Sequence, residues 1–488
     1  MAMPAADAKT ERSSRLFAAV GIAFLLLVWT GASLGSGGSF VPAPWTTAAD
    51  TAVLLSRGYA WAQILTTTVR VCVGFLAGLA AGVVVGVSAG RPRLASMFRP
   101  IVQFFQGMPP LLWAIPLVAL MGVGHLPSIL VIGLITFPLV AVTVGEGMAT
   151  LPREYAEMLS VFAPGVVPRM RELVFPHLRP FLGASVKAGL VLAVKASVTA
   201  EYFGATSGIG FQIQSAYMSL RIRSLFSWAL ILILVILAFT YLMPQVRLLR
   251  RLVPGRAGGR GLAHASSIAP ARPPAPSAGP GRIVLRGVSF SWKGKEKLLE
   301  DVSLTATRKS IVLISGDSGI GKTTLLRLAA SLLSPSEGMI ERPARIGFVF
   351  QDDRLLPWRS IEDNVALPIR YQGRPRRAAL EDARRLLADV GLAGQERRMP
   401  SELSGGMKKR AALARCFARD PEGVLLDEPF SGLHAEARRG LWKTFLKFHA
   451  RRPIPAIVVT HYPEELSAEA DCRLCALAGR PARLFPLR

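Results

Sequence analysis

The sequence predicts a multidomain protein in which an all-α membrane domain of six helices precedes an α/β domain. Six apolar stretches, each about 20 residues long and so able to span a bilayer as a helix, occupy the first half of the chain. Short apolar runs that end in polar residues recur after residue 282 and are typical of buried strands. We therefore expect a cytoplasmic tail at residues 1–15, a membrane domain at 16–250, a linker at 251–281 and the α/β domain at 282–488.

The composition supports a membrane domain and argues against a nucleic-acid partner. Apolar residues make up 51% of the 488 residues, more than in a typical soluble protein. The net charge of +26 would suggest nucleic-acid binding if Lys and Arg gathered on one face, but here they flank the apolar stretches. Cys472 and Cys475 form a single C-x-x-C pair, and a structural zinc needs two, so we interpret them as strand residues.

Basic segments between the apolar stretches predict their orientation. The stretches are residues 16–35, 66–89, 101–122, 126–146, 183–203 and 225–245. Lys and Arg cluster before the first stretch, between the second and third, between the fourth and fifth, and after the sixth, and such an excess marks cytoplasmic segments. The N-terminus and the α/β domain are therefore expected in the cytoplasm, with Arg221 and Arg223 as exceptions on the other side.

The first apolar stretch has a second interpretation. Its basic start, apolar core and small residues Gly31-Ala32-Ser33 loosely fit a cleaved signal peptide. Removing it would leave the C-terminus on the same side of the membrane, so the two interpretations stay open.

A polar segment at residues 153–179 separates the fourth and fifth stretches. Its start predicts a short amphipathic helix, because Pro152 and Glu154 are favourable in a first helical turn. Pro164, Pro168 and Pro176 interrupt the rest of the segment. We expect two short helices that lie along the membrane surface.

Charged residues inside the apolar stretches are candidates for function. Lys187, Lys195 and Glu201 lie in the fifth stretch and Glu146 ends the fourth. A charge at the centre of a bilayer is costly, so Lys195 should face the bundle interior, a partner or water. Lys195 either lines a path and attracts an anionic solute, or belongs to an ion pair that fixes helix packing.

The strongest motif comes directly after the apolar run 311–314 and precedes a helical pattern. It fits G-x-x-x-x-G-K-[ST] and consists of Gly316, Asp317, Ser318, Gly319, Ile320, Gly321, Lys322, Thr323 and Thr324. Such a loop turns tightly and points backbone N–H groups at phosphate oxygens, beside the positive end of a helix. We expect Lys322 to contact the β- and γ-phosphates of ATP and the Thr323 hydroxyl to hold Mg²⁺.

Four further polar residues stand where apolar runs end. Gln351 comes after one run and is suited to touch Mg²⁺ or the attacking water. Asp427 and Glu428 end the next, the first for the Mg²⁺ shell and the second to orient or deprotonate that water. His461 ends a third run, where it can contact the γ-phosphate.

Two more positions are predicted to contact nucleotide. Ser404 is a fitting N-cap for a basic helix, and Gly405 and Gly406 permit close backbone approach, so this is a second anion-binding helix end. Trp292 ends a predicted strand, and either it or Phe290 is expected to stack on adenine, unless Trp292 belongs to the core.

The polar segment resembles the coupling loop of binding-protein-dependent ABC importer permeases, and we name residues 153–179 the coupling segment. Counting back from Pro176 places Glu157-Met158-Leu159 at the family's Glu-Ala-Ala triplet and Ala163 at its glycine, so two alanines and the glycine are missing. Residues 200–210 are similar to the nitrate, sulfonate and taurine branch of these permeases. This resemblance covers roughly residues 60 to 250.

The α/β domain resembles the ABC transporter ATPases over residues 283–485. The resemblance makes Gly316–Thr324 Walker A, Gln351 the Q-loop, Ser404–Met407 the signature with Met for the commoner Gln, Asp427-Glu428 Walker B and His461 the switch histidine. His434 stands where the family usually has Asp, which puts in doubt how two sites would communicate.

The resemblance implies an importer in which each ATP is held between two copies of the chain. We expect a homodimer in a bacterial inner membrane, with a separate extracytoplasmic substrate-binding protein and a small anionic solute such as nitrate, a sulfonate or taurine. The alternatives are an exporter, whose long cytoplasmic helices the sequence does not show, and a membrane-anchored regulatory or signalling ATPase, which the altered triplet and His434 slightly favour.

Overall fold

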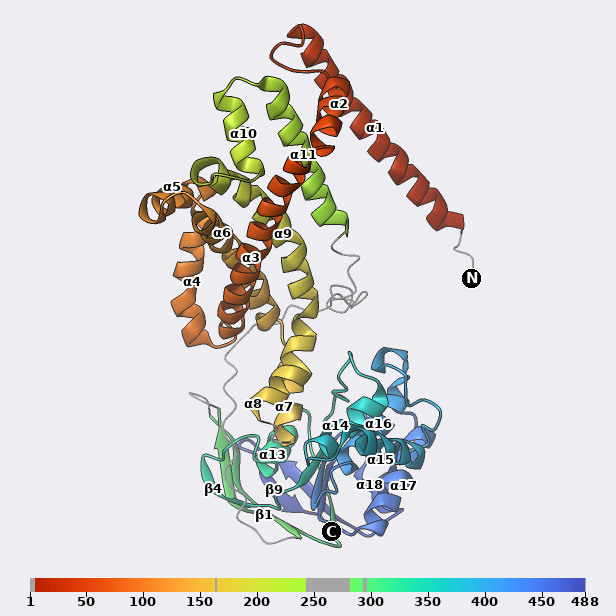
Figure 1. Ribbon diagram of the computed structural model, residues 1–488. Helices are drawn as coiled ribbons and strands as arrows, with labels where there is room; N and C mark the ends of the chain where they lie inside the picture. The colour runs from red at the N-terminus through yellow and green to blue at the C-terminus, as the bar shows by residue number, and fades with distance from the viewer. Residues whose placement is uncertain (1–4, 163–164, 243–280, 293–295, 488) are drawn as a thin grey trace. The chain divides into compact units, whose positions relative to one another are not determined.

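The computed structural model describes residues 5–162, 165–242, 281–292 and 296–487 (Figure 1). The chain divides into two compact units. We name Met1–Leu151 with His177–Ile268 the helical unit, and Pro152–Pro176 with Ala269–Arg488 the α/β unit. The coupling segment up to Pro176 thus belongs to the α/β unit. Ala163 and nearly all of the predicted linker lie outside the described residues.

The helical unit contains no strand among its described residues. Its helices are α1 (Ala5–Gly35), α2 (Pro44–Leu55), α3 (Gly58–Ser88), α4 (Pro92–Gly107), α5 (Pro110–Met121), α6 (His125–Ala149), α9 (Phe175–Gly204), α10 (Ile209–Met218) and α11 (Ile222–Leu242). Four described helical stretches are long and apolar enough to span a membrane: Gly58–Ser88, His125–Ala149, Val166–Gly204 and Ile222–Tyr241. The first predicted stretch lies within α1, whose segment Ala19–Gly35 is apolar.

The third predicted stretch is not one straight helix, which corrects the sequence-based expectation. Residues 101–122 divide between α4 and α5, whose axes differ by 92°. Hydropathy overlooked the sequence Met108-Pro109-Pro110. A residue before proline disfavours the helical conformation, and Met108 is extended, with φ −88° and ψ 124°. Among the described residues, four of the six stretches are long apolar helices, one is the bent pair, and the first lies in α1.

Close packing of α3 on α6 is built on glycines at every fourth position. A Cβ atom at Gly78 would lie 2.1 Å from Thr136 Oγ1, and one at Gly82 would lie 2.6 Å from Val140 Cβ. Gly74 and Gly86 face α6 in the same way. Small residues at this spacing let two helix backbones approach closely in a membrane. The sequence carries this G-x-x-x-G signal, but hydropathy alone does not register it.

A buried ion pair joins α3 to α9 in the helical unit. Arg70 Nη1 lies 2.9 Å from Glu201 Oε1, and both side chains are buried. Thr67 donates to the same carboxylate, and Arg70 also donates to the carbonyl of Ser207 at 2.7 Å. Gly210 N donates to Glu201 Oε2, so the pair also holds the start of α10.

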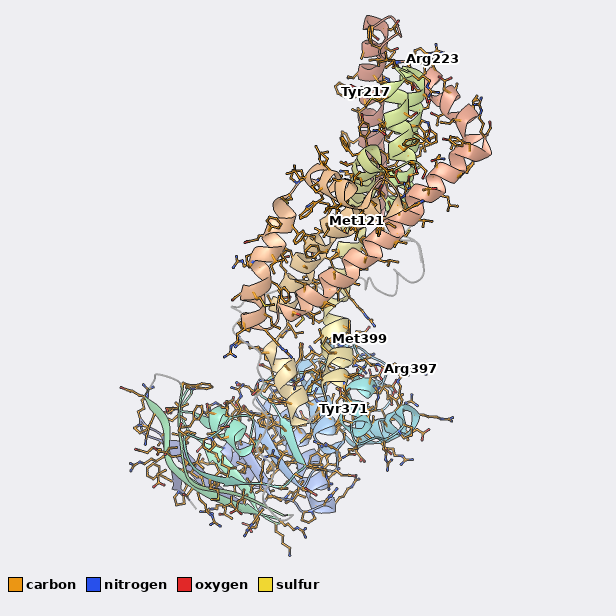
Figure 2. The ribbon with its side chains drawn as sticks, turned by 60° about the vertical axis from the view of Figure 1, so that its left-hand side comes forward. Met121, Tyr217, Arg223, Tyr371, Arg397 and Met399 are labelled. Atoms are coloured by element: carbon orange, nitrogen blue, oxygen red, sulfur yellow. The ribbon has the colours of Figure 1, made fainter. Side chains whose placement is uncertain are left out.

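The turn between α10 and α11 carries the exceptional arginines of the orientation argument. Figure 2 shows Tyr217 and Arg223 together where α10 leads into α11. Arg221 and Arg223 are exposed, so neither adds a charge to the bundle interior.

The α/β unit contains two sheets. Its strands are β1 (Arg282–Ser291), β2 (Lys297–Thr307), β3 (Ile311–Ser315), β4 (Glu337–Glu341), β5 (Ile346–Val349), β6 (Gly423–Asp427), β7 (Ala456–Val459), β8 (Cys472–Ala478) and β9 (Arg483–Pro486). A three-stranded antiparallel sheet has the order β2-β1-β4. The six-stranded sheet has the order β5-β6-β7-β3-β8-β9 and is parallel except for β9.

The α/β unit also contains helices and short helical turns. They are α7 (Arg153–Val161), α8 (Val166–Arg169), the π-helical turn η1 (Met170–Val174), α13 (Lys322–Ala329), α14 (Ile361–Arg370), α15 (Arg376–Asp389), the short η3 (Pro400–Glu402), α16 (Gly405–Phe417), α17 (Ala435–Arg451) and α18 (Pro463–Ser467). One core cluster packs α17 on the sheet, with Trp442 and Phe445 at its centre. A second cluster joins α14, α15 and α16 into a helical subdomain.

Candidate functional site

The candidate site lies at the carboxyl ends of three neighbouring parallel strands. Ile314 of β3 and Asp427 of β6 both pair with Val459 of β7, so these strands end at one level. Glu428 N donates to Val459 O, so the hydrogen bonding between β6 and β7 continues one residue beyond Asp427. This register brings together polar residues that the sequence places after separate apolar runs.

The loop between β3 and α13 has the backbone that its glycines allow. Gly316, Gly319 and Gly321 have φ of 154°, 79° and 111°, a region that favours glycine. Lys322 is buried, and its Nζ donates to the carbonyls of Gly316 at 2.7 Å and Asp317 at 2.9 Å. An ammonium group has three donors, so one remains for an anion.

Asp427 lies beside the first turn of α13. The hydroxyl of Thr323 donates to Asp427 Oδ1 at 3.2 Å. Burial raises the pKa of Asp427 to about 6, and the Thr323 hydroxyl opposes this shift. A buried carboxylate and a hydroxyl are oxygen ligands of the kind that Mg²⁺ takes, and a cation would favour the charged carboxylate. The pair therefore fits a divalent cation.

Glu428 holds two of the other predicted residues. Its Oε1 lies 2.9 Å from His461 Nε2, and its Oε2 accepts from Gln351 Nε2 at 3.3 Å. Glu428 has φ 45°, which is strained for a residue other than glycine. Such strain persists only where the surroundings fix the residue, and it is common at reactive sites. Glu428 is therefore the centre of a three-residue group.

The start of α16 is capped but open. Ser404 Oγ accepts from Met407 N at 3.4 Å and is the N-cap of α16. A Cβ at Gly405 would meet no atom within 4 Å, and Ser404 and Gly405 are exposed. Nothing in the described chain requires a glycine at 405. The N-terminus of α16 is thus free to approach an anion.

The structure shows the surroundings of two residues that the sequence left open, His434 and Trp292. His434 Nδ1 accepts from Ala437 N at 3.4 Å, so this histidine is the N-cap of α17. Trp292 lies just beyond β1, is 44% exposed and contacts Phe290 edge-on at 5.0 Å. Its interpretation as a core residue is wrong, whereas its contact with adenine stays a prediction.

Side chains of α14 and α16 hold the main chain of the loop after Gln351 by hydrogen bonds. Lys409 Nζ donates to Gln351 O at 3.2 Å, and Arg415 donates to the carbonyls of Arg354 and Asp353. Burial lowers the pKa of Arg415 to about 10, so it stays charged at neutral pH. Asn364 is fully buried and both donates to Leu356 O and accepts from Leu356 N.

Glu157 of α7 lies against this loop and α13. Its carboxylate is 2.7 Å from Arg327 Nε and 2.8 Å from Arg354 Nη1. Arg419 also donates to Val161 O at the end of α7. Glu157 was predicted from the sequence but its arginines were not, because pairing between residues so far apart in the chain leaves no local signal.

Lys195 is exposed on α9, and no ion pair joins it to another described residue. The internal ion pair that was its alternative role belongs to Arg70 and Glu201. The sequence does carry a signal for Arg70, a single charge inside the second apolar stretch, but Arg70 was not predicted as a functional residue. Glu172, a buried residue of η1, was not predicted either.

Comparison with known proteins identifies both halves. Residues 299–431 match the family described as ABC transporter, and residues 74–253 match the binding-protein-dependent transport system inner membrane component.

Two curated relatives are aliphatic sulfonates import ATP-binding proteins. SsuB 1 of Rhodococcus jostii is 43% identical over 180 residues, which are 36% of this chain and 71% of the relative. SsuB 2 of Frankia alni is 40% identical over 200 residues, 41% of this chain and 79% of the relative. A third relative is an uncharacterized ABC transporter ATP-binding protein of Methanocaldococcus jannaschii. It is 38% identical over 204 residues, 40% of this chain and 76% of the relative.

A solved structure, the ATP-binding cassette MJ0796 bound to ADP and Pi, is 25% identical and covers 42% of this chain and 99% of its own. Its TM-score is 0.38. The family matches and the curated relatives show which family the chain belongs to. The chain belongs to the ABC transporters, as an importer that fuses its permease and ATP-binding subunits and couples ATP hydrolysis to transport across a membrane.

Proposed function

We propose that this chain imports a small anionic solute, of the nitrate, sulfonate or taurine kind, across a bacterial inner membrane. A separate extracytoplasmic binding protein delivers the solute to a homodimer of the chain. The family of the helical unit and the sulfonate-import relatives support the proposal. The observation that carries it is that Lys322, Asp427 and Glu428 lie at the same edge of the sheet, where β3 and β6 end. His461 lies beside Glu428 at this edge.

In this proposal, the loop Gly316–Thr324 binds the phosphates of ATP. Its N–H groups and the remaining donor of Lys322 hold phosphate oxygens. Thr323 and Asp427 hold Mg²⁺, with Gln351 as a further oxygen ligand. Bound Mg²⁺ supplies positive charge that neutralises the phosphates. Trp292 offers its exposed ring to adenine.

Glu428 orients the attacking water or takes its proton. Its strained backbone fixes the carboxylate, and Gln351 and His461 hold its two oxygens. His461, whose Nε2 lies 2.9 Å from Glu428 Oε1, is the candidate donor to the γ-phosphate. The Glu428→Gln variant keeps the shape but not the base, so we expect ATP binding with turnover reduced about 100-fold or more.

The exposed start of α16 supports a homodimer. Ser404, Gly405 and Gly406 would close on a nucleotide held by the phosphate-binding loop of a second copy. Gly405 has open space in its own chain, so its lack of a side chain is explained by an outside partner. Such an assembly has two equivalent ATP sites related by a two-fold axis.

The coupling segment transmits changes at the ATP site to the helices that come after it. Glu157 contacts Arg327 on the helix of the phosphate-binding loop and Arg354 in the loop after Gln351. Both arginines lie within a few residues of predicted nucleotide contacts. Ala163, the other predicted coupling residue, lies outside the described residues.

The exposed face of α9 is the candidate solute path. Lys187 and Lys195 are exposed there, and neither has an acidic partner among the described residues. Lipid would not solvate two ammonium groups, so this face should meet water, a solute or the second copy. Two positive charges without neighbouring carboxylates favour a negatively charged solute on this face.

Uptake into vesicles tests the proposal. The full chain, reconstituted with ATP on the side of the α/β unit and with the candidate binding protein outside, should take up taurine, ethanesulfonate or nitrate. Glu428→Gln should abolish uptake, and Lys195→Met should lower it while ATP turnover persists. Steady ATP hydrolysis without uptake of any of these anions would contradict the proposal.

A further inference from the structure

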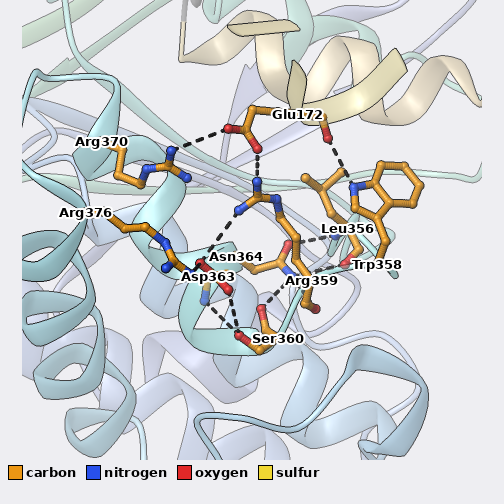
Figure 3. A network of polar contacts seen from close by, with 9 residues as sticks. All are labelled: Glu172, Leu356, Trp358, Arg359, Ser360, Asp363, Asn364, Arg370 and Arg376. Carbon is orange, nitrogen blue, oxygen red and sulfur yellow. Dashed lines mark hydrogen bonds and ion pairs between the residues drawn. The ribbon is translucent and has the colours of Figure 1, made fainter. Parts of the chain in front are cut away.

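Glu172 is buried in the α/β unit and bound by two arginines. Its carboxylate accepts from Arg359, with Arg370 Nη2 at 3.6 Å from the other oxygen (Figure 3). We name Glu172, Trp358, Arg359 and Arg370 the Glu172 cluster. Only 3% of Glu172 is exposed, so its charge depends on these partners.

The main chain of Glu172 is attached as well as its side chain. Pro176 has no N–H, so the carbonyl of Glu172 lacks its normal α-helical donor four residues on. Trp358 Nε1 donates to this carbonyl at 3.1 Å. The attachment lies in the π-helical turn η1, directly before α9. The indole N–H thus bonds a carbonyl for which Pro176 supplies no donor.

The arginines of the Glu172 cluster belong to the two ends of α14. Arg359 precedes the N-cap Ser360, and Arg370 lies in the last turn. Arg359 also lies 3.7 Å from Asp363 in the first turn of α14. Buried Asn364 accepts from Leu356 N and donates to Arg359 O, which fixes the loop that begins at Gln351. A displacement of Gln351 therefore reaches Arg359 through a loop whose main chain is held at Gln351, Arg354 and Leu356.

Glu157 and Glu172 both contact the loop after Gln351, and each also contacts a different helix of the α/β unit. Glu157 contacts α13, the helix after the phosphate-binding loop, as well as the loop after Gln351. Glu172 contacts α14, which packs into the helical subdomain with α15 and α16. Two separate attachments let the segment between them respond to a change in the relative position of α13 and α14.

We propose that Glu172 is a positioning residue for coupling, the second attachment through which nucleotide-driven movement of α14 reaches α9. It rests on the proposed transport cycle only in requiring that α9 respond to ATP. Glu172 touches neither nucleotide nor solute. Its role is to transmit movement, so its loss should separate ATP hydrolysis from the response of α9.

The test uses the full chain in vesicles and measures two quantities in the same sample. One is ATP turnover. The other is the rate at which a maleimide labels a cysteine placed at Ala188, an exposed residue of α9, with ATP or with ADP. The background carries Cys72→Ser. Burial raises the pKa of Cys416 to about 12 and that of Cys472 to about 11, so these thiols stay protonated and react little at neutral pH.

Glu172→Gln removes the charge and keeps the carbonyl that Trp358 contacts. We expect turnover within about twofold of the wild type, whereas the labelling ratio between ATP and ADP falls from roughly 5-fold or more to near one. Glu172→Asp should restore part of the ratio. Asp382→Asn is the matched control, because it breaks an ion pair with Arg374 at the surface of the same unit.

Two results would overturn the role of Glu172. One is a wild-type labelling ratio in Glu172→Gln. The other is a parallel fall in turnover, labelling ratio and melting temperature, which indicates a purely structural role. Failure of the proposed function gives a different result: the labelling ratio would respond to ATP and to Glu172→Gln while no anion is taken up.

Discussion

Both units of this transporter contain a buried glutamate that pairs with arginine, and the pairs of Glu201 and Glu172 differ in the elements they join. Glu201 pairs with Arg70 in the helical unit, and both residues lie within one set of packed helices. Glu172 lies in the coupling segment and pairs with Arg359 and Arg370 of the helical subdomain. The first pair joins two helices, α3 and α9, of the same helical unit. The second joins the coupling segment to the helical subdomain of the α/β unit.

The comparison teaches that a buried ion pair takes its role from the elements it joins. Hydrogen-bond partners of this pair, His125 and Ser207 for Arg70 and Thr67 for Glu201, all belong to the helical unit. Breaking that pair should cost stability. Breaking the Glu172 cluster should instead weaken the response of α9 to ATP, because α14 and η1 each remain packed without it. Variants of the two pairs separate these outcomes.

The largest effect is expected from Arg70→Met. It leaves the Glu201 carboxylate buried without a cation, which typically costs about 3 to 5 kcal/mol. Thermal unfolding of the purified protein should show a large loss of stability of the helical unit. The double variant Arg70→Met with Glu201→Gln should lose less than the sum of the two single variants, because no unpaired charge remains. Additive losses would show that the two side chains do not interact.

A smaller effect is expected from Gly78→Val, which tests the rigid packing around the first pair. A Cβ at this position would lie 2.1 Å from Thr136 Oγ1, so α3 must move away from α6. Overpacking of this kind costs about 1 to 3 kcal/mol. Gly58→Ala is the control on the same helix, because a Cβ there meets no atom within 4 Å. Equal melting temperatures for the two variants would argue against close α3–α6 packing.

The smallest effect is expected from Trp358→Phe in the second pair. The change removes the hydrogen bond to the Glu172 carbonyl and keeps a ring against Tyr155, which contacts Trp358 edge-on at 5.8 Å. A lost hydrogen bond of this type costs about 1 kcal/mol. The ATP-dependent labelling ratio at Ala188→Cys should fall only in part, with turnover unchanged. A fall as large as that of Glu172→Gln would mean that the carbonyl, not the carboxylate, is the main attachment.

Local patterns indicated which residues meet at the candidate site better than they indicated which residues the coupling segment contacts. Asp427, Glu428 and His461 each come after an apolar run, and parallel strands that end at one level bring such residues together. Their mutual contacts result from that topology.

Other contacts could not be predicted because they depend on tertiary structure. Nothing in the sequence near Glu172 indicates Arg359 or Trp358, which lie far along the chain. The bend between α4 and α5 was different, since Pro109 and Pro110 gave a local signal that hydropathy ignores. The same holds for the repeated glycines of α3.

The central claim is that ATP joins two copies of the α/β unit, and an inter-chain crosslink tests it most directly. Ser318 in the phosphate-binding loop and Ser404 before α16 are both exposed in the chain, and each is replaced by cysteine for this test. In the full chain carrying Glu428→Gln, mild oxidation with ATP and Mg²⁺ should give a disulfide-linked product of twice the chain mass, and oxidation with ADP should give little. Only single-chain product with ATP, from a protein that hydrolyses ATP when Glu428 is intact, would contradict the account.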